Sequence, residues 1–318
     1  RLAEAAARMA IIARLDRGDA ETDLPPWLRD AMGDDGAIAD LAARLETTED
    51  EAPATRGLKP PLHLSYSQID LYRRCPACYH VKHVLGLVDE PTSAQVVGTV
   101  AHAALEKFYR QWSDADNEGR PKPGKDDLVR MGRALFFDAS ARAGGVDRAQ
   151  LVQIESQLDA GYDAFHDDNA EIVMIEEKLK LPYRRASGDD EAAHTIEAKI
   201  DRVERVTTEG GDGFRIVDYK TGGAWKTLLE PKADDLQLGI YALALADAHG
   251  MEAEELTGEA AYWVLSTQQA GVIPLESLDI AGIRSEIDGA ITGMLEGRFE
   301  QGKKCDGTCR LFAGGSQP

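Results

Sequence analysis

One stretch of the chain, residues 195–221, limits the possible folds more than any other. It contains two runs rich in β-branched residues, Thr195–Val206 and Phe214–Thr221, with the Gly-rich join TTEGGDG between them. Two β-rich runs across a short Gly-rich turn are typical of an antiparallel hairpin. The chain is therefore expected to contain a sheet that includes this hairpin.

The hairpin brings two acidic residues close together. Asp201 lies nine residues before the turn at Gly210, and Asp218 lies eight residues after it. Such positions are near cross-strand partners, with Cβ atoms about 4.5–5.5 Å apart when they share a face. Two carboxylates at that separation repel each other unless a cation or a shared proton intervenes. A divalent metal ion would remove the repulsion.

A lysine follows on the second strand of the hairpin. Lys220 comes two residues after Asp218, so strand alternation puts both on one face and Tyr219 on the other. Metal-bound carboxylates beside an ammonium group suit phosphodiester hydrolysis, because the metal lowers the pKa of bound water and the lysine stabilises charge. An isolated Asp-x-Lys is usually a solvated cross-strand pair, but the paired Asp201 favours a catalytic role here.

The elements around the hairpin predict the fold class. Helical patterns cover residues 95–112, 126–143, 148–167, 236–248 and 280–297, and further strand patterns cover 171–183 and 260–266. This order predicts an α/β sandwich with a mixed sheet rather than a regular alternation of parallel βαβ units. Glu176 and Glu177 fall on the strand before the hairpin. One of them could reach the metal, but a solvated edge is the favoured interpretation for both.

The N-terminal part of the chain differs from the rest in composition. Residues 1–50 are Ala-rich with helical periodicity, and residues 51–61 are acidic and then Pro-rich. We expect residues 1–50 to be the tail of a preceding domain or an appendage, 51–61 a linker, and 62–318 the main domain. The absence of an initiator Met suggests a fragment of a longer polypeptide.

The charge balance argues against a surface built for bulk nucleic-acid binding. The chain has 36 basic and 56 acidic residues, a formal charge of −20. A local basic channel stays compatible with this total. Its candidate residues, each also interpretable as a plain surface charge, are Lys82, His83, Arg184, Arg185, Arg202, Lys226 and Lys232. With neither a secretory signal nor an apolar stretch of about 18 residues, we expect a cytoplasmic protein with no membrane contact.

Four cysteines form two close pairs far apart in the sequence, Cys75 with Cys78 and Cys305 with Cys309. In a chain without a secretory signal, paired cysteines favour a metal over disulfides. Four thiolates satisfy either zinc or an iron–sulfur cluster. The alternative is that these are free or buried thiols.

Five motifs in order resemble the RecB-family nucleases of the PD-(D/E)XK superfamily. They are Leu64–Leu87, Gly98–Tyr109 with its Gly-x-x-x-His, Ala198–Val203, Phe214–Gly222, and Gln237–Tyr241 with its Gln-x-x-x-Tyr. Together they cover about residues 62–310. The resemblance implies a restriction-endonuclease-like core, a mixed central sheet flanked by helices, as found at the C-terminus of UvrD-like and AddB-like helicase–nucleases.

The resemblance also implies roles for individual residues. The metal ligands would be His102, Asp201, Asp218 and the backbone carbonyl of Tyr219, with Mg²⁺ or Mn²⁺ as the ion. Lys220 would be the catalytic lysine, and Gln237 and Tyr241 would position it or the DNA.

Some relatives also bind an iron–sulfur cluster through a Cys-Pro segment before the core and further cysteines after it. Cys75 matches the first of these positions, and Cys305 and Cys309 match the later ones. The usual C-terminal spacing, Cys-x2-Cys-x5-Cys, is replaced here by Cys-x3-Cys. Cys78 would therefore have to supply the fourth thiolate.

The expected function is that of a Mg²⁺- or Mn²⁺-dependent deoxyribonuclease, exonuclease-like on single-stranded or unwound DNA ends. It would act with a helicase domain or subunit in DNA break repair. The chain holds no Gly-x-x-x-x-Gly-Lys-Ser/Thr loop for ATP hydrolysis of its own. The alternatives are a stand-alone nuclease for defence or CRISPR adaptation, and a catalytically silent DNA-binding scaffold.

Overall fold

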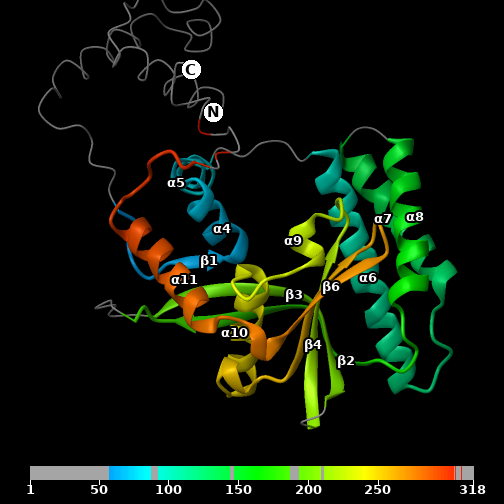
Figure 1. The fold of residues 1–318 in the computed structure, drawn as a ribbon. Coiled ribbons are helices and arrows are strands. Elements are labelled where there is room, and N and C mark those ends of the chain that lie inside the picture. Colours follow the sequence, from blue (N-terminus) through cyan, green and yellow to red (C-terminus); the bar gives the residue numbers. More distant parts are fainter. Residues whose placement is uncertain are drawn as a thin grey trace, which may run out of the picture. The chain divides into compact units, whose positions relative to one another are not determined.

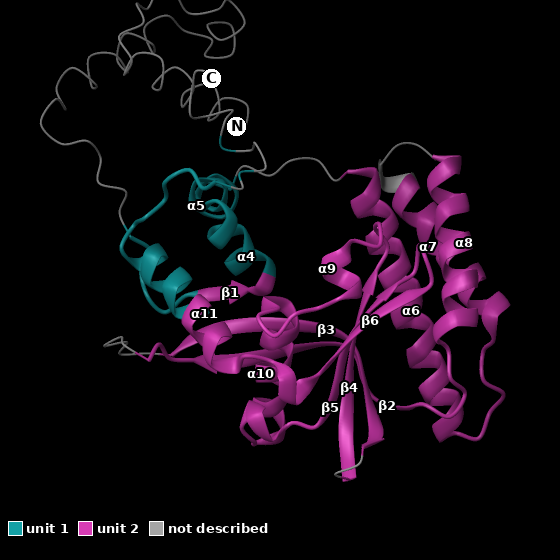
Figure 2. Ribbon diagram, in the orientation of Figure 1, with its two compact units in different colours: residues 1–62, 67–89, 287–318 teal, residues 63–66, 90–286 magenta. Residues whose placement is uncertain are grey.

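The computed structural model describes residues 57–86, 92–143, 147–186, 193–208, 211–303, 305 and 309 (Figure 1). These residues belong to two compact units (Figure 2). The first unit takes its described residues from Arg1–Leu62, Ser67–Asp89 and Ile287–Pro318, and the second from His63–Tyr66 and Glu90–Glu286. The helical segment expected at 1–50 lies outside the described residues, as does most of the linker expected at 51–61.

The second unit is built around one mixed sheet. Its strands are β1 (His63–Ser65), β2 (Glu171–Tyr183), β3 (His194–Thr208), β4 (Gly211–Lys220), β5 (Gly258–Val264) and β6 (Gln269–Pro274). They follow the order β1-β3-β4-β5-β6, and β2 also pairs with β3. The β1–β3 and β4–β5 pairs are parallel and the others antiparallel. The expected α/β class with a mixed sheet is confirmed.

Strand β3 changes its neighbour along one edge. Strand β2 pairs with β3 from His194 to Arg205 and so occupies one edge. On the other edge β1 pairs with residues 195–197, and β4 pairs with residues 202–208 in the expected antiparallel hairpin. Between these two ladders, none of the described strands pairs with residues 198–201 on that edge. Asp201 lies at the end of this gap.

Helices cover both faces of the sheet in the second unit (Figure 1). Helices α6 (Ser93–Asn117), α7 (Lys125–Ala143) and α8 (Arg148–Phe165) form one layer, and their apolar side chains share a core with Val217 and Tyr219. Helix α10 (Leu236–His249) contacts strands β2, β3 and β4. The remaining short elements are α9 (Lys226–Leu229) and the 3-10 turns η3 (Ala253–Glu255) and η4 (Leu275–Ser277).

The first unit joins segments from both ends of the sequence. Most of α4 (Tyr66–Arg74) lies in this unit, followed by α5 (Pro76–Tyr79) and the π-helical turn η2 (His80–Val84). The end of α11 (Ile280–Leu295) and the segment after it complete the unit. The Tyr72 hydroxyl donates to the carbonyl of Arg298 at 2.6 Å, and Phe299 lies almost parallel to the Tyr79 ring. The C-terminal segment therefore packs along the N-terminal helices.

Two strands of the sheet, β1 and β6, were not predicted from the sequence. Strand β1 has three residues, too few to show a period-2 pattern, and β6 contains Gly271 and ends at Pro274. Both residue types weaken a strand pattern, and proline is tolerated at an edge because it has no N–H to donate. None of the helices in the described ranges combines the length and apolar character that a membrane span requires.

Candidate active site

Three acidic side chains lie in one row across neighbouring strands. The β2–β3 register places Glu176 opposite Asp201, and the β3–β4 register, continued by one residue, places Asp218 opposite Asp201. The three residues are 7%, 5% and 3% exposed, respectively. Buried carboxylates side by side are costly unless positive charge is close. The row is therefore a place where a cation would stabilise the fold.

Helix α6 adds an imidazole to this row. The Nδ1 atom of His102 lies 3.2 Å from Asp201 Oδ1 and 3.5 Å from Glu176 Oε1. Its Nε2 atom lies 3.0 Å from the backbone carbonyl oxygen of Tyr219. His102, Glu176 and Asp201 each offer one ligand atom, all within 4.8 Å of one another. Nitrogen and carboxylate oxygen in this arrangement suit a divalent metal ion.

Backbone groups near residues 198–201 of β3 hold these side chains in place. The amide N–H of Tyr219 donates to Asp201 Oδ2 at 2.7 Å. Beyond the end of the β3–β4 ladder, the Asp201 carboxylate thus accepts this N–H in place of a backbone carbonyl. Gly98, one turn before His102, lets α6 approach the end of β4, because a Cβ there would lie 3.2 Å from Thr221 Oγ1. Close packing of α6 against this segment therefore favours a small residue at position 98.

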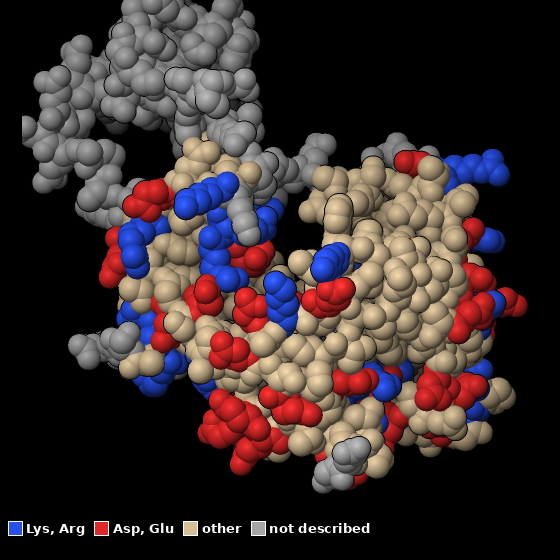
Figure 3. Space-filling view, in the orientation of Figure 1, with Lys and Arg blue, Asp and Glu red and all other residues tan. Residues whose placement is uncertain are grey.

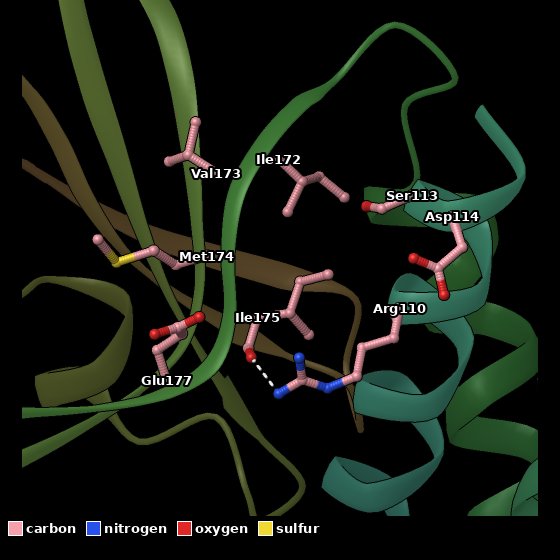
Figure 4. Close-up of a pocket in the computed structure, with 8 residues that line it drawn as sticks. All are labelled: Arg110, Ser113, Asp114, Ile172, Val173, Met174, Ile175 and Glu177. Atoms are coloured by element: carbon pink, nitrogen blue, oxygen red, sulfur yellow. Dashed lines mark hydrogen bonds between the residues drawn. The ribbon is translucent and has the colours of Figure 1, made fainter. Parts of the chain in front are cut away.

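Glu176 reaches the site through an unusual backbone conformation. Its φ angle is +50°, a region that costs a non-glycine residue about 1–2 kcal/mol. The Arg110 guanidinium donates to the carbonyl of Ile175 at 2.8 Å across an open pocket of about 300 Å³ between α6 and β2 (Figure 4). Glu177 lines this pocket and is exposed. The solvated-edge interpretation is therefore confirmed for Glu177 and wrong for Glu176.

The negative charge of the carboxylate row is offset by bound protons and by neighbouring basic side chains. Burial and the nearby Asp218 charge raise the pKa of Asp201 to about 6. Burial alone would lower the pKa of His102, but hydrogen bonds to Asp201 and Glu176 outweigh it and raise that pKa to about 10. Lys199 forms an ion pair with Glu176 from the exposed side. The site thus holds positive charge close to its carboxylates.

A second network surrounds the lysine of β4. Lys220 Nζ lies 2.6 Å from Asp218 Oδ2 and donates to Gln237 Oε1 at 3.0 Å. The Gln237 amide donates to Asp218 Oδ1 at 2.6 Å and to the Tyr241 hydroxyl at 2.9 Å. Tyr241 also donates to Asp218 Oδ1 at 3.1 Å. Asp218 therefore belongs to the lysine network, next to the His102–Glu176–Asp201 group.

Two further residues of this second network, Asp235 and Tyr262, were not among the residues predicted from the sequence. Asp235 caps α10 by accepting from the Leu238 amide at 3.0 Å, and it also accepts from the Tyr262 hydroxyl at 2.8 Å. Lys220 Nζ lies 5.0 Å from the centre of the Tyr262 ring. Only the Asp of an N-cap is a recognisable sequence pattern. The position of Tyr262 depends on how β5 pairs with β4.

One candidate for the DNA path is excluded by burial. Arg202 is 1% exposed, lies 4.1 Å from the centre of the Tyr109 ring and forms an ion pair with Glu204. It is a core residue, because β3 turns it toward the α6–α8 layer. Lys226 and Lys232 are exposed. Figure 3 shows Lys and Arg side chains interspersed with Asp and Glu side chains over the face in view.

The four cysteines meet in the first unit. The Sγ atoms are 3.8 Å apart for Cys75 and Cys309, 3.4 Å for Cys78 and Cys305, and 3.1 Å for Cys305 and Cys309. None of the four forms a disulfide, and their four sulfur atoms lie within 4.8 Å of one another. Sulfur atoms around a tetrahedral ion at about 2.3 Å lie about 3.8 Å apart. These separations therefore fit one bound ion with little rearrangement.

The approach of the C-terminal segment depends on a glycine. The amide of Gly302 donates to Cys75 Sγ at 3.3 Å, and a Cβ at Gly302 would lie 2.1 Å from the carbonyl oxygen of Arg74. Burial, together with hydrogen bonding to Cys305, raises the pKa of Cys309 to about 12. Without a metal the Cys309 thiol is therefore protonated at neutral pH, and a metal would stabilise its thiolate.

Comparison with known proteins places the chain in a family. Residues 63–311 match the family model of the PD-(D/E)XK nuclease superfamily. The chain is also 28% identical over 262 residues to a subunit of the ATP-dependent helicase/deoxyribonuclease of Moorella thermoacetica, and this match covers 74% of the chain. It spans only 22% of that relative's length. The chain therefore belongs to the PD-(D/E)XK nuclease superfamily.

Proposed function

We propose that this chain is a divalent-metal-dependent nuclease that hydrolyses phosphodiester bonds in DNA. The observation that carries the proposal is the row of Glu176, Asp201 and Asp218, with His102 on one side and Lys220 on the other. Family membership supports the reaction class, and the arrangement of buried acids beside an imidazole and an ammonium group supports an intact site. A site that had lost catalysis would not need to keep this costly set of charges together.

The metal would be held by His102, Glu176, Asp201 and the carbonyl of Tyr219, and Asp218, opposite Asp201 on the neighbouring strand, is the further ligand expected from the sequence. Glu176 is added to the ligands expected from the sequence because it lies within reach of the other two side chains. Mg²⁺ or Mn²⁺ is the expected ion, since both accept carboxylate and carbonyl oxygen. When bound, such an ion neutralises phosphate charge and makes its bound water more acidic.

The protein's own groups would then orient the reaction. Lys220 presents its ammonium group beside the row, where it can stabilise negative charge on the phosphate or hold the attacking water. Gln237 and Tyr241 hold Asp218 from the other side and so restrict the carboxylate that pairs with Lys220. In this scheme Gln237 and Tyr241 are positioning residues.

The test is cleavage of end-labelled single- and double-stranded DNA with Mg²⁺, Mn²⁺ or EDTA. Wild type is compared with Lys220→Ala, and with Lys178→Ala, whose side chain on β2 is 61% exposed, as the matched control. We expect metal-dependent cutting that falls about 10²–10⁴-fold in Lys220→Ala and is unchanged in Lys178→Ala. Cleavage that persists in Lys220→Ala contradicts the assignment, and the product ladder gives the direction of digestion.

We further propose that the chain acts on single-stranded or unwound DNA ends as part of a helicase–nuclease in break repair. The support is the similarity to a helicase/deoxyribonuclease subunit, of which this chain matches a limited part. The full-length protein, or its complex with a helicase subunit, should degrade duplex DNA with ATP, whereas this chain alone should need a pre-existing single strand. Equal duplex degradation without ATP contradicts a helicase partner.

The four cysteines are proposed to bind a structural metal, either an iron–sulfur cluster or zinc. The close group of four sulfurs supports a metal of some kind. Anaerobic purification followed by elemental analysis and visible absorption separates the two. An iron–sulfur protein would be coloured and contain iron with sulfide, and a zinc protein would be colourless. A metal-free protein of full stability contradicts both.

A further inference from the structure

The loop that follows the catalytic strand presents a tryptophan to solvent. Trp225 is 70% exposed, the most exposed of the large hydrophobic side chains among the described residues. A single exposed apolar side chain is ordinary on protein surfaces. Trp225 needs a separate explanation because of the loop that carries it, its closeness to Lys220 and the charge beside it.

The loop is anchored although its tryptophan is exposed. The Leu265 amide donates to the carbonyl of Lys220 at 2.8 Å, and the Gln157 side chain donates to the carbonyl of Thr221 at 3.0 Å. The Ser266 hydroxyl donates to the carbonyl of Gly222. Hydrogen bonds to three consecutive carbonyls hold the start of the loop on the body of the second unit.

Within the described part of the chain, the hydrogen bonds of the tryptophan are those of its backbone. Its amide donates to the carbonyl of Gly223 at 2.9 Å, and its carbonyl accepts from the Leu228 amide at 2.9 Å, as the N-cap of α9. The ring lies beside Gly223, where an added Cβ would be 3.8 Å from the nearest indole atom. An aromatic ring on a fixed backbone can take up a flat partner with little loss of chain entropy.

The position of this ring relates it to the proposed active site. Trp225 comes five residues after Lys220, and five residues span at most about 18 Å even when fully extended. The next residue, Lys226, has a side chain that is 83% exposed, and among the described residues its ion pair is with the exposed Glu230, at 3.4 Å. Such exposed pairs contribute little free energy, so the ammonium group can exchange its partner for a phosphate.

We propose that Trp225 is a stacking platform for an unpaired nucleobase of the substrate strand, with Lys226 contacting the adjoining phosphate. This inference rests on the proposed nuclease function and adds to it the residues that would bind the single strand. Aromatic side chains beside a positive charge are how proteins hold single strands without reading their sequence. Bases inside a duplex have both faces covered by their neighbours, so the platform selects single-stranded DNA.

The test measures binding of fluorescently labelled DNA in the Lys220→Ala background with Ca²⁺, so that the strand stays intact. Trp225→Ala is compared with Trp225→Phe, and with Phe137→Ala as a control, since Phe137 is a 45% exposed aromatic on α7. We expect Trp225→Ala to weaken binding of a single strand about 5- to 100-fold. Trp225→Phe should retain most of the affinity, and Phe137→Ala and a covalently closed duplex should show no change.

A second arm identifies the partner of the ring as a base. Abasic sites are placed one at a time along the oligonucleotide. At one or two adjacent positions the abasic site should weaken binding to the Trp225-containing protein, and the same substitution should have no further effect with Trp225→Ala. Such non-additivity is expected only when the two changes remove the same contact.

Several results would overturn the inference. They are unchanged single-strand affinity in Trp225→Ala, an equal loss for the closed duplex, and abasic effects that are the same with and without Trp225. A surface for a protein partner would give the first of these results. If Lys220-dependent cleavage is observed alongside any of them, only this inference fails. Trp225-dependent binding without any cleavage would instead contradict the nuclease proposal.

Discussion

The two groups of candidate metal ligands are built in opposite ways. The row of Glu176, Asp201 and Asp218 lies on three neighbouring strands, and sheet register alone places the three side chains in line. The cysteine group joins two short segments whose thiols are separated by 234 residues for Cys75 and Cys309. No strand ladder connects those segments among the described residues of the first unit.

This difference has an energetic consequence. The carboxylate row has cations of its own, because Lys199 pairs with Glu176 and Lys220 pairs with Asp218. The thiols contact one another and the backbone amide of Gly302. We therefore expect the carboxylate site to fold without its metal and to need the metal for chemistry. The cysteine group should need its metal for stability.

The strongest test of this contrast is Asp218→Ala. Removing a carboxylate of the row should reduce cleavage by at least about 10³-fold, since metal-assisted stabilisation is worth several kcal/mol. The melting temperature should stay close to that of wild type. Asp212→Ala, an exposed position on the same strand, is the matched control and should behave as wild type. Retained activity in a pure sample of Asp218→Ala would falsify the site assignment.

The opposite phenotype is expected for Cys75→Ser. Loss of one of four ligands should release the metal and lower the melting temperature by about 5–10 °C, with cleavage per folded molecule little changed. Differential scanning fluorimetry and metal analysis measure both effects. Ala77→Ser places a hydroxyl in α5, two residues from Cys75, without removing a thiol and should cause neither. An unchanged melting temperature in Cys75→Ser means that there is no structural metal.

A smaller effect separates the two adjacent glutamates. Glu176→Gln should weaken Mn²⁺ binding by about 10- to 100-fold, because it removes one carboxylate charge from the His102–Glu176–Asp201 group. Glu177→Gln, one residue away and exposed, should bind Mn²⁺ as wild type does. Calorimetric titration of the metal measures both. Equal affinities for the two variants would remove Glu176 from the ligand set.

The smallest expected effect is that of Tyr241→Phe. It removes one hydrogen bond to Asp218 and should reduce the maximal rate about tenfold, leaving metal affinity within about twofold of wild type. Tyr162→Phe, a hydroxyl on α8, serves as the control. A change in metal affinity as large as the change in rate would mean that Asp218 is positioned for the metal rather than for Lys220.

Much of the arrangement of β3 and β4 could be predicted from the sequence. The nearly equal distances of Asp201 and Asp218 from the turn predicted their pairing, and strand alternation predicted that Lys220 would lie beside Asp218. The i,i+4 spacing of Gln237 and Tyr241 predicted a shared face, and their side chains are hydrogen-bonded. These predictions succeeded because each depends on local periodicity, which tertiary packing does not alter.

The role of Glu176 could not be predicted from the local sequence pattern. The β2–β3 register shifts between Ile172 and Met174, so one extra residue is inserted before Glu176. Such a bulge changes which residues of a strand face a given side. Alternation read from the sequence therefore cannot decide between Glu176 and Glu177. The positive φ of Glu176 and the Arg110 bond to the preceding carbonyl depend on where α6 lies.

By itself, then, the sequence determined the hairpin, the acidic pair with its lysine, and the family to which the chain belongs. The tertiary structure alone decided that Glu176 joins the site, that Arg202 is buried, and that four distant cysteines meet. The physical reason is the separation along the sequence of the residues that interact. Pairing across a short turn and the faces of a strand or helix follow from neighbouring residues, whereas bulged register and contacts between distant segments follow from how whole elements pack.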